Sequence, residues 1–380
     1  MDCRACGAAT EQFLSLGQQP LPNRFLLPEQ LDLPEPRYPL ELYFCPGCGL
    51  VQLGVVVPPE ELFSDYLYAS STSALTREHF EKLASYLRLR FGIPQGGLVV
   101  DLAANDGILL RPLRELGLRA VGVEPATNLC QLAWHDGLHT FNEFFTQKTV
   151  ERIGPGTADM VTACNVFAHV DDIRAFTENV KRLLKPQGVF VLEVQYLGSM
   201  VKDISFDNMY LEHLSYFTLS PLVRFFASQG MQVIDVSLVP THGGSLRLAA
   251  AQDGARTVSP SVAAFLRSEK EAGLQDLGTF KHFAQRVEEV KERLPRLLAG
   301  LNGLVAGYGA AAKSSTILNY CQIGPETVSY IVDDSPLKQG RWTPLSHIPI
   351  VGPKELERAR PDCILVLAWN YLESIKASTS

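Results

Sequence analysis

Four cysteines near the start of the chain form two pairs whose spacing suits metal binding. Each pair has the form Cys-x-x-Cys, Cys3 with Cys6 and Cys45 with Cys48, and a glycine follows each pair. Two such turns supply the four sulfur ligands of a tetrahedral zinc site. Four thiolates leave no open coordination position, so the predicted zinc ion is structural. Two disulfides or four unrelated buried thiols are the alternatives.

A second group of reactive side chains is acidic. The apolar segment LVVDLAANDG ends in a tight turn that contains Asp101, Asn105, Asp106 and Gly107. This turn lacks the GxGxxG pattern of dinucleotide sites, and its carboxylates would repel a diphosphate. Acidic groups suit a ligand with an ammonium and a sulfonium, which S-adenosylmethionine presents. Turn and cap chemistry is the alternative explanation for the two aspartates.

Other residues extend this predicted cofactor site. Glu124 ends the next predicted strand, RAVGVEPA, where a carboxylate can accept both ribose hydroxyls. Asn142, with Phe144 and Phe145, would flank the adenine, and Asn165 ends the strand under the methionine part. The predicted cofactor-binding set is Asp101, Ala103, Asn105, Asp106, Gly107, Glu124, Asn142, Phe145 and Asn165.

A third group lies in the stretch FDNMYLEHLSYFTL, after the fourth predicted strand. His213 is the predicted base, Glu212 a carboxylate that orients it or binds a substrate hydroxyl, and Tyr210 a phenol donor. His169 follows the strand in NVFAHV and is expected to face the same cavity. For each histidine, a helix cap or a satisfied core imidazole is the alternative.

A second glycine-rich turn, GYGAAAK at residues 307–313, has the opposite chemistry. It approximates GxGxxA with Lys313 in the first helical turn, which favours a phosphate. Asp333 and Asp334 close the next strand, where a ribose hydroxyl could be held. A tight turn without a ligand is the alternative, because the motif alone is a weak signal. The predicted substrate-binding set is Tyr66, Tyr68, His242, Arg247, Gly309, Lys313 and Asn319.

The order of predicted elements indicates how these residues are positioned. Four buried strands alternate with helices between residues 98 and 197, which predicts parallel βαβ units in a doubly wound sheet. MQVIDVSLV and GSLRLAAAQ follow with no helix between them, and such a hairpin is more typical of methyltransferases than of dehydrogenases. One long amphipathic helical stretch is expected over 261–300, followed by a second Rossmann-like unit.

Composition narrows the function classes. A chain of 380 residues predicts two or three domains, and its net charge of -7 offers no basic footprint for nucleic acid. We see no apolar run that could cross a bilayer and no secretory signal, so we expect no membrane partner and a cytoplasmic location. The other cysteines, Cys130, Cys164, Cys321 and Cys363, are expected to be small core residues.

The combination resembles the sugar C-methyltransferases of deoxysugar biosynthesis, which act at C-3 of dTDP-4-keto sugars. The matching stretches follow one another along nearly the whole chain: the paired CxxC, SLGQQPLPNRF, DLAANDGILL, NEFFT, NVFAHVDD, FDNMYLEHLSYF, HGGSLR, GYGAAAKSSTILNYC, VDDSPLKQGR and HIPI. The family usually reads YHEH where this chain has Tyr210-Leu211-Glu212-His213, so one imidazole is replaced by an aliphatic side chain.

The resemblance implies an α/β protein in three parts. These are a zinc-binding lobe (1–65), a class I S-adenosylmethionine methyltransferase domain with a Rossmann-like fold (66–253), and a C-terminal Rossmann-like domain that holds the nucleotide sugar (254–380). It also implies a C-methyltransferase that uses S-adenosylmethionine and a base-generated enolate. An NAD(P)H-dependent 4-ketoreductase, alone or in a bifunctional enzyme, a non-catalytic nucleotide-sugar-binding protein, and an O- or N-methyltransferase are the alternatives.

Overall fold

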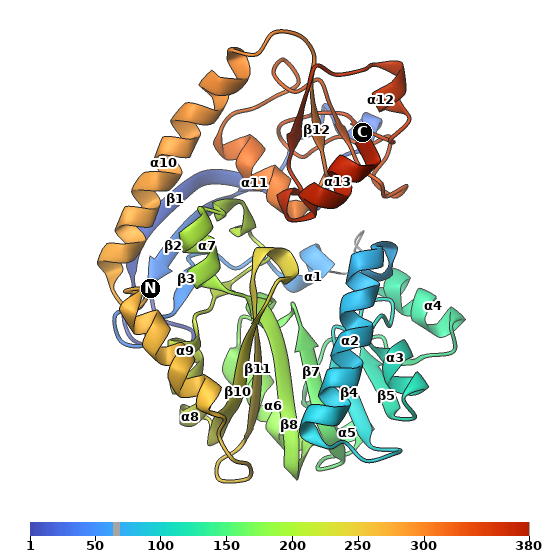
Figure 1. Cartoon of the computed structure of the whole chain (residues 1–380), viewed down its shortest axis with the longest axis vertical. Coiled ribbons are helices and arrows are strands. Elements are labelled where there is room, and N and C mark those ends of the chain that lie inside the picture. Colours follow the sequence, from blue (N-terminus) through green and yellow to red (C-terminus); the bar gives the residue numbers. More distant parts are fainter. Residues whose placement is uncertain (64–68, 380) are drawn as a thin grey trace.

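The chain folds around three β-sheets (Figure 1). The computed structural model describes residues 1–63 and 69–379. Two residues predicted to bind substrate, Tyr66 and Tyr68, lie outside the described residues. Among the described residues, no helix has both the length and the apolar character that a membrane crossing requires.

The N-terminal lobe is built on an antiparallel sheet of four strands. In β2, Leu40, Leu42 and Phe44 are buried in alternation, as expected for a strand with one face in a core. The fourth strand, β9, comes from far along the chain, so residues 1–65 alone do not complete this sheet. The strands, in spatial order, are β1 (Glu11–Pro20), β2 (Arg37–Phe44), β3 (Val51–Leu53) and β9 (Ser215–Tyr216).

The central sheet confirms the predicted topology. It has the order β10-β11-β8-β7-β4-β5-β6, and β11 is the one described strand of this sheet that runs in the opposite direction to the others. The β10–β11 hairpin therefore closes an otherwise parallel sheet. The strands are β4 (Leu98–Leu102), β5 (Arg119–Val123), β6 (His139–Phe141), β7 (Ala158–Cys164), β8 (Leu184–Gln195), β10 (Met231–Val239) and β11 (Ser245–Gln252).

Helices cover both faces of the central sheet. The predicted helix before β4 is α2, which begins after Ser73, whose side chain accepts a hydrogen bond from Thr76 N, and ends at Gly92 in the left-handed region. Its apolar side buries Phe80 and Leu83 against the sheet. The helices around this sheet are α2 (Ala74–Phe91), α3 (Leu110–Glu115), α4 (Thr127–His135), α5 (Gln147–Ile153), α6 (Ile173–Leu183) and α8 (Leu219–Ser228); α1 (Pro59–Phe63) precedes them. The helix α7 (Leu197–Asp203) instead packs Leu197 and Met200 into the apolar cluster of the N-terminal lobe and the C-terminal domain.

The C-terminal domain is the predicted second Rossmann-like unit. Its parallel sheet has the order β14-β13-β12-β15, and α11 follows β12 directly. The elements are β12 (Val305–Tyr308), α11 (Ala312–Tyr320), β13 (Tyr330–Val332), β14 (Ile350–Val351), α12 (Glu355–Arg358), β15 (Cys363–Val366) and α13 (Leu372–Thr379).

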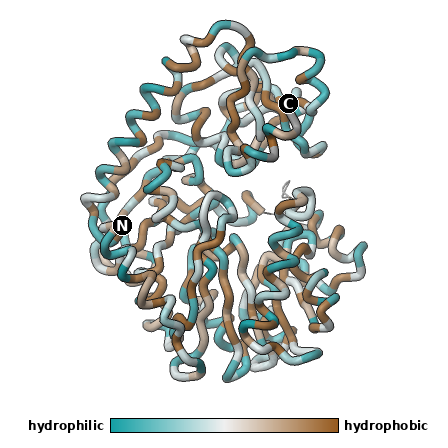
Figure 2. The backbone as a smooth tube through the Cα atoms, in the orientation of Figure 1, coloured by the Kyte–Doolittle hydropathy of each residue, from teal (hydrophilic) through white to brown (hydrophobic). Residues whose placement is uncertain are grey.

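The expectation of one long helical stretch over 261–300 was wrong. The segment forms α9 (Pro260–Glu271) and α10 (Leu277–Ala299), separated by a turn in which Gly273 has a φ of +66°. A left-handed glycine ends a helix readily because it has no Cβ to clash. α10 runs from the central domain to the C-terminal domain (Figure 1), and apolar and polar residues alternate along it (Figure 2).

The helix α10 joins the N-terminal lobe to the C-terminal domain through a shared core. The Phe280 ring lies 5.5 Å from the Phe13 ring and 5.2 Å from the Phe44 ring of the antiparallel sheet. The same buried cluster continues into Leu318 of α11 and Ile331 of β13. The lobe is therefore packed between the other two parts, and this position brings it to the site described next.

Candidate active site

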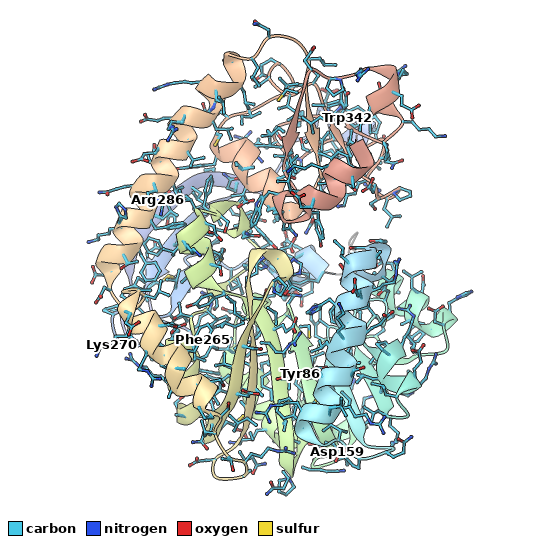
Figure 3. All side chains as sticks on the ribbon, in the orientation of Figure 1. Tyr86, Asp159, Phe265, Lys270, Arg286 and Trp342 are labelled. Carbon is cyan, nitrogen blue, oxygen red and sulfur yellow. The ribbon has the colours of Figure 1, made fainter. Side chains whose placement is uncertain are left out.

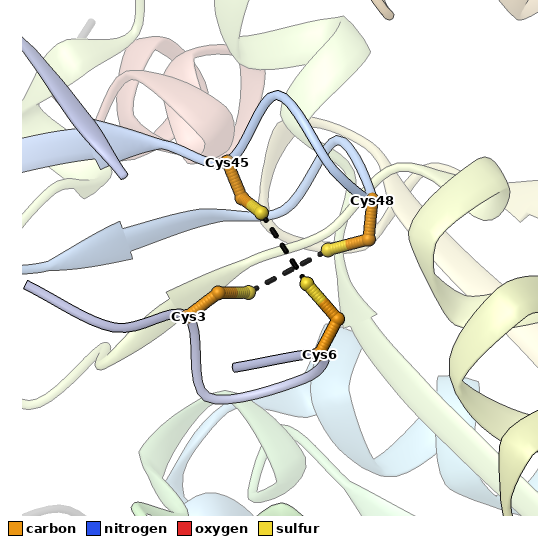
Figure 4. A group of neighbouring side chains, drawn as sticks. All are labelled: Cys3, Cys6, Cys45 and Cys48. Carbon is orange, nitrogen blue, oxygen red and sulfur yellow. Dashed lines mark hydrogen bonds between the residues drawn. The ribbon is translucent and has the colours of Figure 1, made fainter. Parts of the chain in front are cut away.

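The four N-terminal cysteines converge on one point (Figure 4). Their sulfur atoms all lie within 4.8 Å of one another, with 3.5 Å between Cys3 and Cys48 and 3.4 Å between Cys6 and Cys45. Four sulfurs at about 2.3 Å from a tetrahedral zinc ion lie about 3.7 Å apart, which this cluster fits. A disulfide bond requires a distance of about 2.05 Å between its two sulfur atoms. The disulfide alternative is thus wrong, and all four thiols are free.

A cavity of about 940 Å³ opens where the three parts of the chain meet. It lies at the carboxyl ends of the central parallel strands, where ligands of doubly wound sheets bind. The N-terminal lobe contributes Asn23, the central domain Glu124 and His213, and the C-terminal domain Lys313.

The turn after β4 gives one end of this cavity an acidic character. Asp101 is buried, its Oδ1 accepts a hydrogen bond of 2.6 Å from Thr162, and burial raises its pKa to about 7. Glu124 lies at the end of β5, and burial also raises its pKa. Its carboxylate accepts Asn105 N at 2.9 Å and Ala126 N at 2.8 Å, which fixes its orientation beside the turn.

Backbone strain gathers at the same strand ends. Ala103 and Asn105 each have a φ of +53°, and Asn165, after β7, has a φ of +57°. Non-glycine residues rarely adopt this region, and such positions concentrate at functional sites. All three residues line the cavity, together with Phe145.

Three residues of the predicted cofactor set shape the turn from outside the cavity lining. Asp106 accepts a hydrogen bond from Ser71 N at 3.1 Å. Gly107 has a φ of +81°, and a Cβ there would lie 2.2 Å from Leu138 Cδ1. Asn142 donates its amide to the carbonyl of Glu124 at 3.0 Å. The Asp106 and Asn142 side chains thus each make a hydrogen bond within the protein, and Gly107 allows close packing against Leu138.

One ring nitrogen of His213 is held by a backbone carbonyl. Its Nδ1 lies 3.0 Å from the carbonyl oxygen of Asn208, which can only accept, so Nδ1 donates and Nε2 carries the lone pair. Burial holds the pKa of this imidazole well below its usual value, and the nearby His169 contributes to the shift. The Tyr210 ring packs on it with the centroids 4.1 Å apart. His213 and Tyr210 both line the cavity.

His169 faces His213 edge-on, with 4.9 Å between the ring centroids. Burial lowers its pKa to about 4, so this imidazole is also neutral near pH 7. Within the described part of the chain, its buried Nδ1 has no hydrogen-bond partner. A buried nitrogen in a cavity wall without a protein partner is a candidate contact for a ligand.

The side chains of Glu212 and Leu211 do not line the cavity that His213 lines. The Glu212 carboxylate accepts a hydrogen bond of 2.6 Å from Asn23 of the N-terminal lobe, and only Asn23 of this pair lines the cavity. Leu211, where the resembling family has histidine, is buried in the apolar cluster shared with the C-terminal domain. Leu211 therefore packs in the apolar core close to His213 in the chain.

The C-terminal turn contributes a buried lysine to the cavity lining. Lys313, in the first turn of α11 as predicted, contacts Asn370 Oδ1 and lies 4.6 Å from the centre of the Trp369 ring. Trp369 in turn donates to Asp207 Oδ2 at 2.7 Å. Burial lowers the pKa of Lys313 to about 8. Sequence reasoning missed this supporting set, because Asp207 and Trp369 are distant from Lys313 in the chain.

Two other predicted substrate residues, His242 and Arg247, line the cavity from the β10–β11 hairpin. Arg247 Nε donates to Glu193 Oε1 at 2.5 Å, and its guanidinium lies 5.0 Å from the ring centre of Tyr86, which α2 carries beside the sheet (Figure 3). His79 lies 2.8 Å from the other Glu193 oxygen. Arg247 thus belongs to a buried charged cluster at the cavity wall.

Gly309 and Asn319 lie outside the cavity lining. Gly309 has a φ of +97°, and a Cβ there would lie 2.4 Å from the Cβ of Ala368, so this glycine permits close packing. The Asn319 amide donates to the carbonyls of Ser315 at 2.8 Å and Pro344 at 3.3 Å. This geometry favours a structural role for both residues.

Asp333 is also engaged within the protein. Its Oδ2 accepts the amide of Ala310 at 2.8 Å and lies 3.5 Å from Lys338 Nζ. The Ala310 amide of the glycine-rich turn is thus bonded to a carboxylate, as the Asn105 amide is bonded to Glu124. The second turn therefore offers a dinucleotide phosphate one free amide fewer.

The seven-stranded sheet with its hairpin edge and the acidic turn after β4 define a class I S-adenosylmethionine methyltransferase. Three family models match in order along the chain. They are described as "Putative zinc binding domain" over residues 3–63, "Methyltransferase domain" over 75–236, and "C-methyltransferase C-terminal domain" over 240–380.

Sequence comparison with known proteins identifies the family within this class of methyltransferases. C-methyltransferase NovU from Streptomyces niveus is 37% identical over 381 residues, which cover 98% of this chain and 91% of that protein. A ubiquinone biosynthesis O-methyltransferase from Rhodopseudomonas palustris (strain HaA2) is 31% identical over 115 residues, 30% of this chain and 44% of that protein. The chain belongs to the C-methyltransferase family that includes NovU, and it is an S-adenosylmethionine-dependent enzyme with a zinc-binding lobe.

Proposed function

We propose that this C-methyltransferase acts at C-3 of a nucleotide-linked 4-keto deoxysugar, with dTDP as the nucleotide, through an enolate. The observation that carries the proposal is the position of His213. A neutral imidazole with its lone pair on Nε2 lines a cavity that is acidic at one end and holds a buried lysine at the other. The four reduced thiols suit a reducing compartment such as the cytoplasm.

The acidic end is the proposed cofactor site. Glu124 would hold the ribose hydroxyls, Asp101 would face the positive charges, and Phe145 would contact the adenine. Bound S-adenosylmethionine supplies an electrophilic methyl group on a positively charged sulfur. The residues fit this group because buried carboxylates with raised pKa values gain a cationic partner when it binds.

His213 performs the proton transfer in this proposal. A ketone at C-4 acidifies the proton on C-3, and Nε2 of His213 removes it while Nδ1 remains bonded to Asn208. His169 or Tyr210 donates a hydrogen bond to the oxygen on which negative charge develops. The carbanion carbon then takes the methyl group, and holding both reactants in one cavity supplies much of the acceleration.

Lys313 is the proposed contact for the diphosphate. Its ammonium contacts Asn370 and the Trp369 ring, and Lys313 lines the same cavity as Glu124. This arrangement would place the nucleotide against the C-terminal domain and the sugar beside His213.

The exchange of the C-3 proton with solvent deuterium tests this function. The enzyme is incubated with a dTDP-4-keto-6-deoxysugar and S-adenosylhomocysteine, which cannot donate a methyl group, and deuterium at C-3 is measured by mass spectrometry. We expect exchange, and we expect His213→Asn to lower both exchange and methyl transfer by about 10²–10⁴-fold. Methyl transfer without exchange in the unmodified enzyme would indicate an O- or N-methyltransferase and refute the proposal.

A further inference from the structure

The first zinc-binding turn carries an arginine whose side chain reaches the segments that follow His213 and His169. Arg4 lies between Cys3 and Cys6, and its side chain is 7% exposed. Its Nη1 donates to the carbonyls of Leu53 and Leu214, each at 3.0 Å, and its Nε donates to Asp171 Oδ1, also at 3.0 Å. One guanidinium thus joins three segments that are far apart in the sequence.

Two of these segments carry the active-site imidazoles. Leu214 directly follows His213, and Asp171 comes two residues after His169. A backbone hydrogen bond of 2.8 Å from Leu214 N to Ala168 O also ties the segments together. Arg4 therefore holds both of the segments that carry His213 and His169, and the two histidine rings lie 4.9 Å apart.

The zinc-binding turn is itself held in place. The amide of Arg4 donates to Gln52 Oε1 at 2.8 Å, and the Gln52 amide donates to the carbonyl of Asp2 at 3.0 Å. Gln52 lies in β3, opposite Ser215 of β9. On the outer side, Arg174 contacts the carbonyl of Ala5. Four sulfur–metal bonds would make this turn a rigid support.

We propose that Arg4 is a positioning residue for the base, through which the zinc-binding lobe fixes the relative placement of His213 and His169. This inference rests on the proposed function of His213. A guanidinium suits the role because its planar fork makes several directed hydrogen bonds at once, which the single ammonium of lysine cannot reproduce. The ion pair with the exposed Asp171 contributes little, so the buried contacts to the two carbonyls carry the effect.

The test compares Arg4→Ala with the control Arg174→Met, which removes a contact to the same zinc-binding turn but none to the histidine segments. For Arg4→Ala we expect methyl transfer and C-3 deuterium exchange to fall together by about 10- to 100-fold. The zinc content, the stoichiometry of S-adenosylmethionine binding and the KM for the sugar nucleotide should be unchanged. Arg174→Met should keep normal turnover.

Chemical rescue separates positioning from a general loss of structure. Millimolar guanidinium chloride should restore part of the turnover of Arg4→Ala, and sodium chloride at the same ionic strength should not. The inference is overturned if Arg4→Ala has normal turnover, or if turnover falls only in proportion to bound zinc or bound S-adenosylmethionine. If the unmodified enzyme shows no deuterium exchange, the proposed function fails, whereas turnover and rescue still decide the role of Arg4.

Discussion

The two glycine-containing turns of this chain have the same construction and opposite charge. Each connects a parallel strand to a helix, and in each a carboxylate from the next strand accepts a backbone amide of the turn. Glu124 accepts Asn105 N at 2.9 Å in the central domain, and Asp333 accepts Ala310 N at 2.8 Å in the C-terminal domain.

The charges that face the cavity differ between the turns. The central turn presents Asp101 and Glu124, whose pKa values burial raises, whereas the C-terminal turn presents Lys313, whose pKa burial lowers. Asp333 is neutralised by Lys338 and does not line the cavity. The same turn construction therefore presents buried carboxylates to the cavity in the central domain and a buried lysine in the C-terminal domain.

Among the tests that compare the two turns, the largest expected effect is on cofactor affinity when the carboxylate beside each turn is replaced. Glu124→Gln should weaken S-adenosylmethionine binding by about 100-fold, because two hydrogen bonds to a charged acceptor are lost or weakened. Calorimetry measures the affinity. Asp333→Asn, at the corresponding position of the other turn, is the control and should leave that affinity unchanged. Equal losses in both variants would contradict the division of roles.

The next effect concerns the cation. Lys313→Met keeps an apolar stem against Trp369 and should raise the KM for the sugar nucleotide by about 10-fold or more, because one charged contact to the diphosphate is lost. The affinity for S-adenosylmethionine should not change. Lys354→Met, which removes an exposed lysine of the same domain, should leave both quantities unchanged. An unchanged KM in Lys313→Met would show that the second turn holds no phosphate.

A smaller expected effect is that binding at the two turns weakens in opposite directions of pH. Asp101 has a pKa of about 7 and gains protons below it, so affinity for the cationic cofactor should fall at acidic pH, by at most tenfold per pH unit. Lys313 has a pKa of about 8 and loses its proton above it, so the KM for the sugar nucleotide should rise at alkaline pH. Calorimetry and steady-state kinetics between pH 5.5 and 9.5 measure the two curves. Asp101→Asn should reduce the acidic limb, with the part due to Glu124 remaining, and should leave the alkaline limb unchanged.

The last prediction is that the second turn does not bind a nicotinamide cofactor. Because Asp333 bonds the Ala310 amide and leaves a dinucleotide phosphate one free amide fewer, titration with NADPH should give no enhancement of its fluorescence. A saturable enhancement that Lys313→Met removes would contradict the comparison and favour a reductase activity of the second turn.

Much of the fold and part of the site could be predicted from local sequence. The strand–turn–helix segments, the hairpin at the edge of the sheet and the two Cys-x-x-Cys turns depend on residues that are neighbours in the chain. The grouping of Asp101 with Glu124 also follows from the sequence, because the carboxyl ends of parallel strands meet at one edge of a sheet.

Only the tertiary structure decided which side chains reach the cavity and which are bonded within the protein. Asn23 meets Glu212 across 189 positions, and Arg4 meets Leu214 across 210. Such contacts depend on the register of β3 with β9 and on the packing of the lobe between two domains, which no local motif encodes. The same packing takes Asn319 and Gly309 out of the cavity lining. The sequence by itself therefore determined the kinds of chemistry that this protein carries, and the long-range packing decided which residues carry it out.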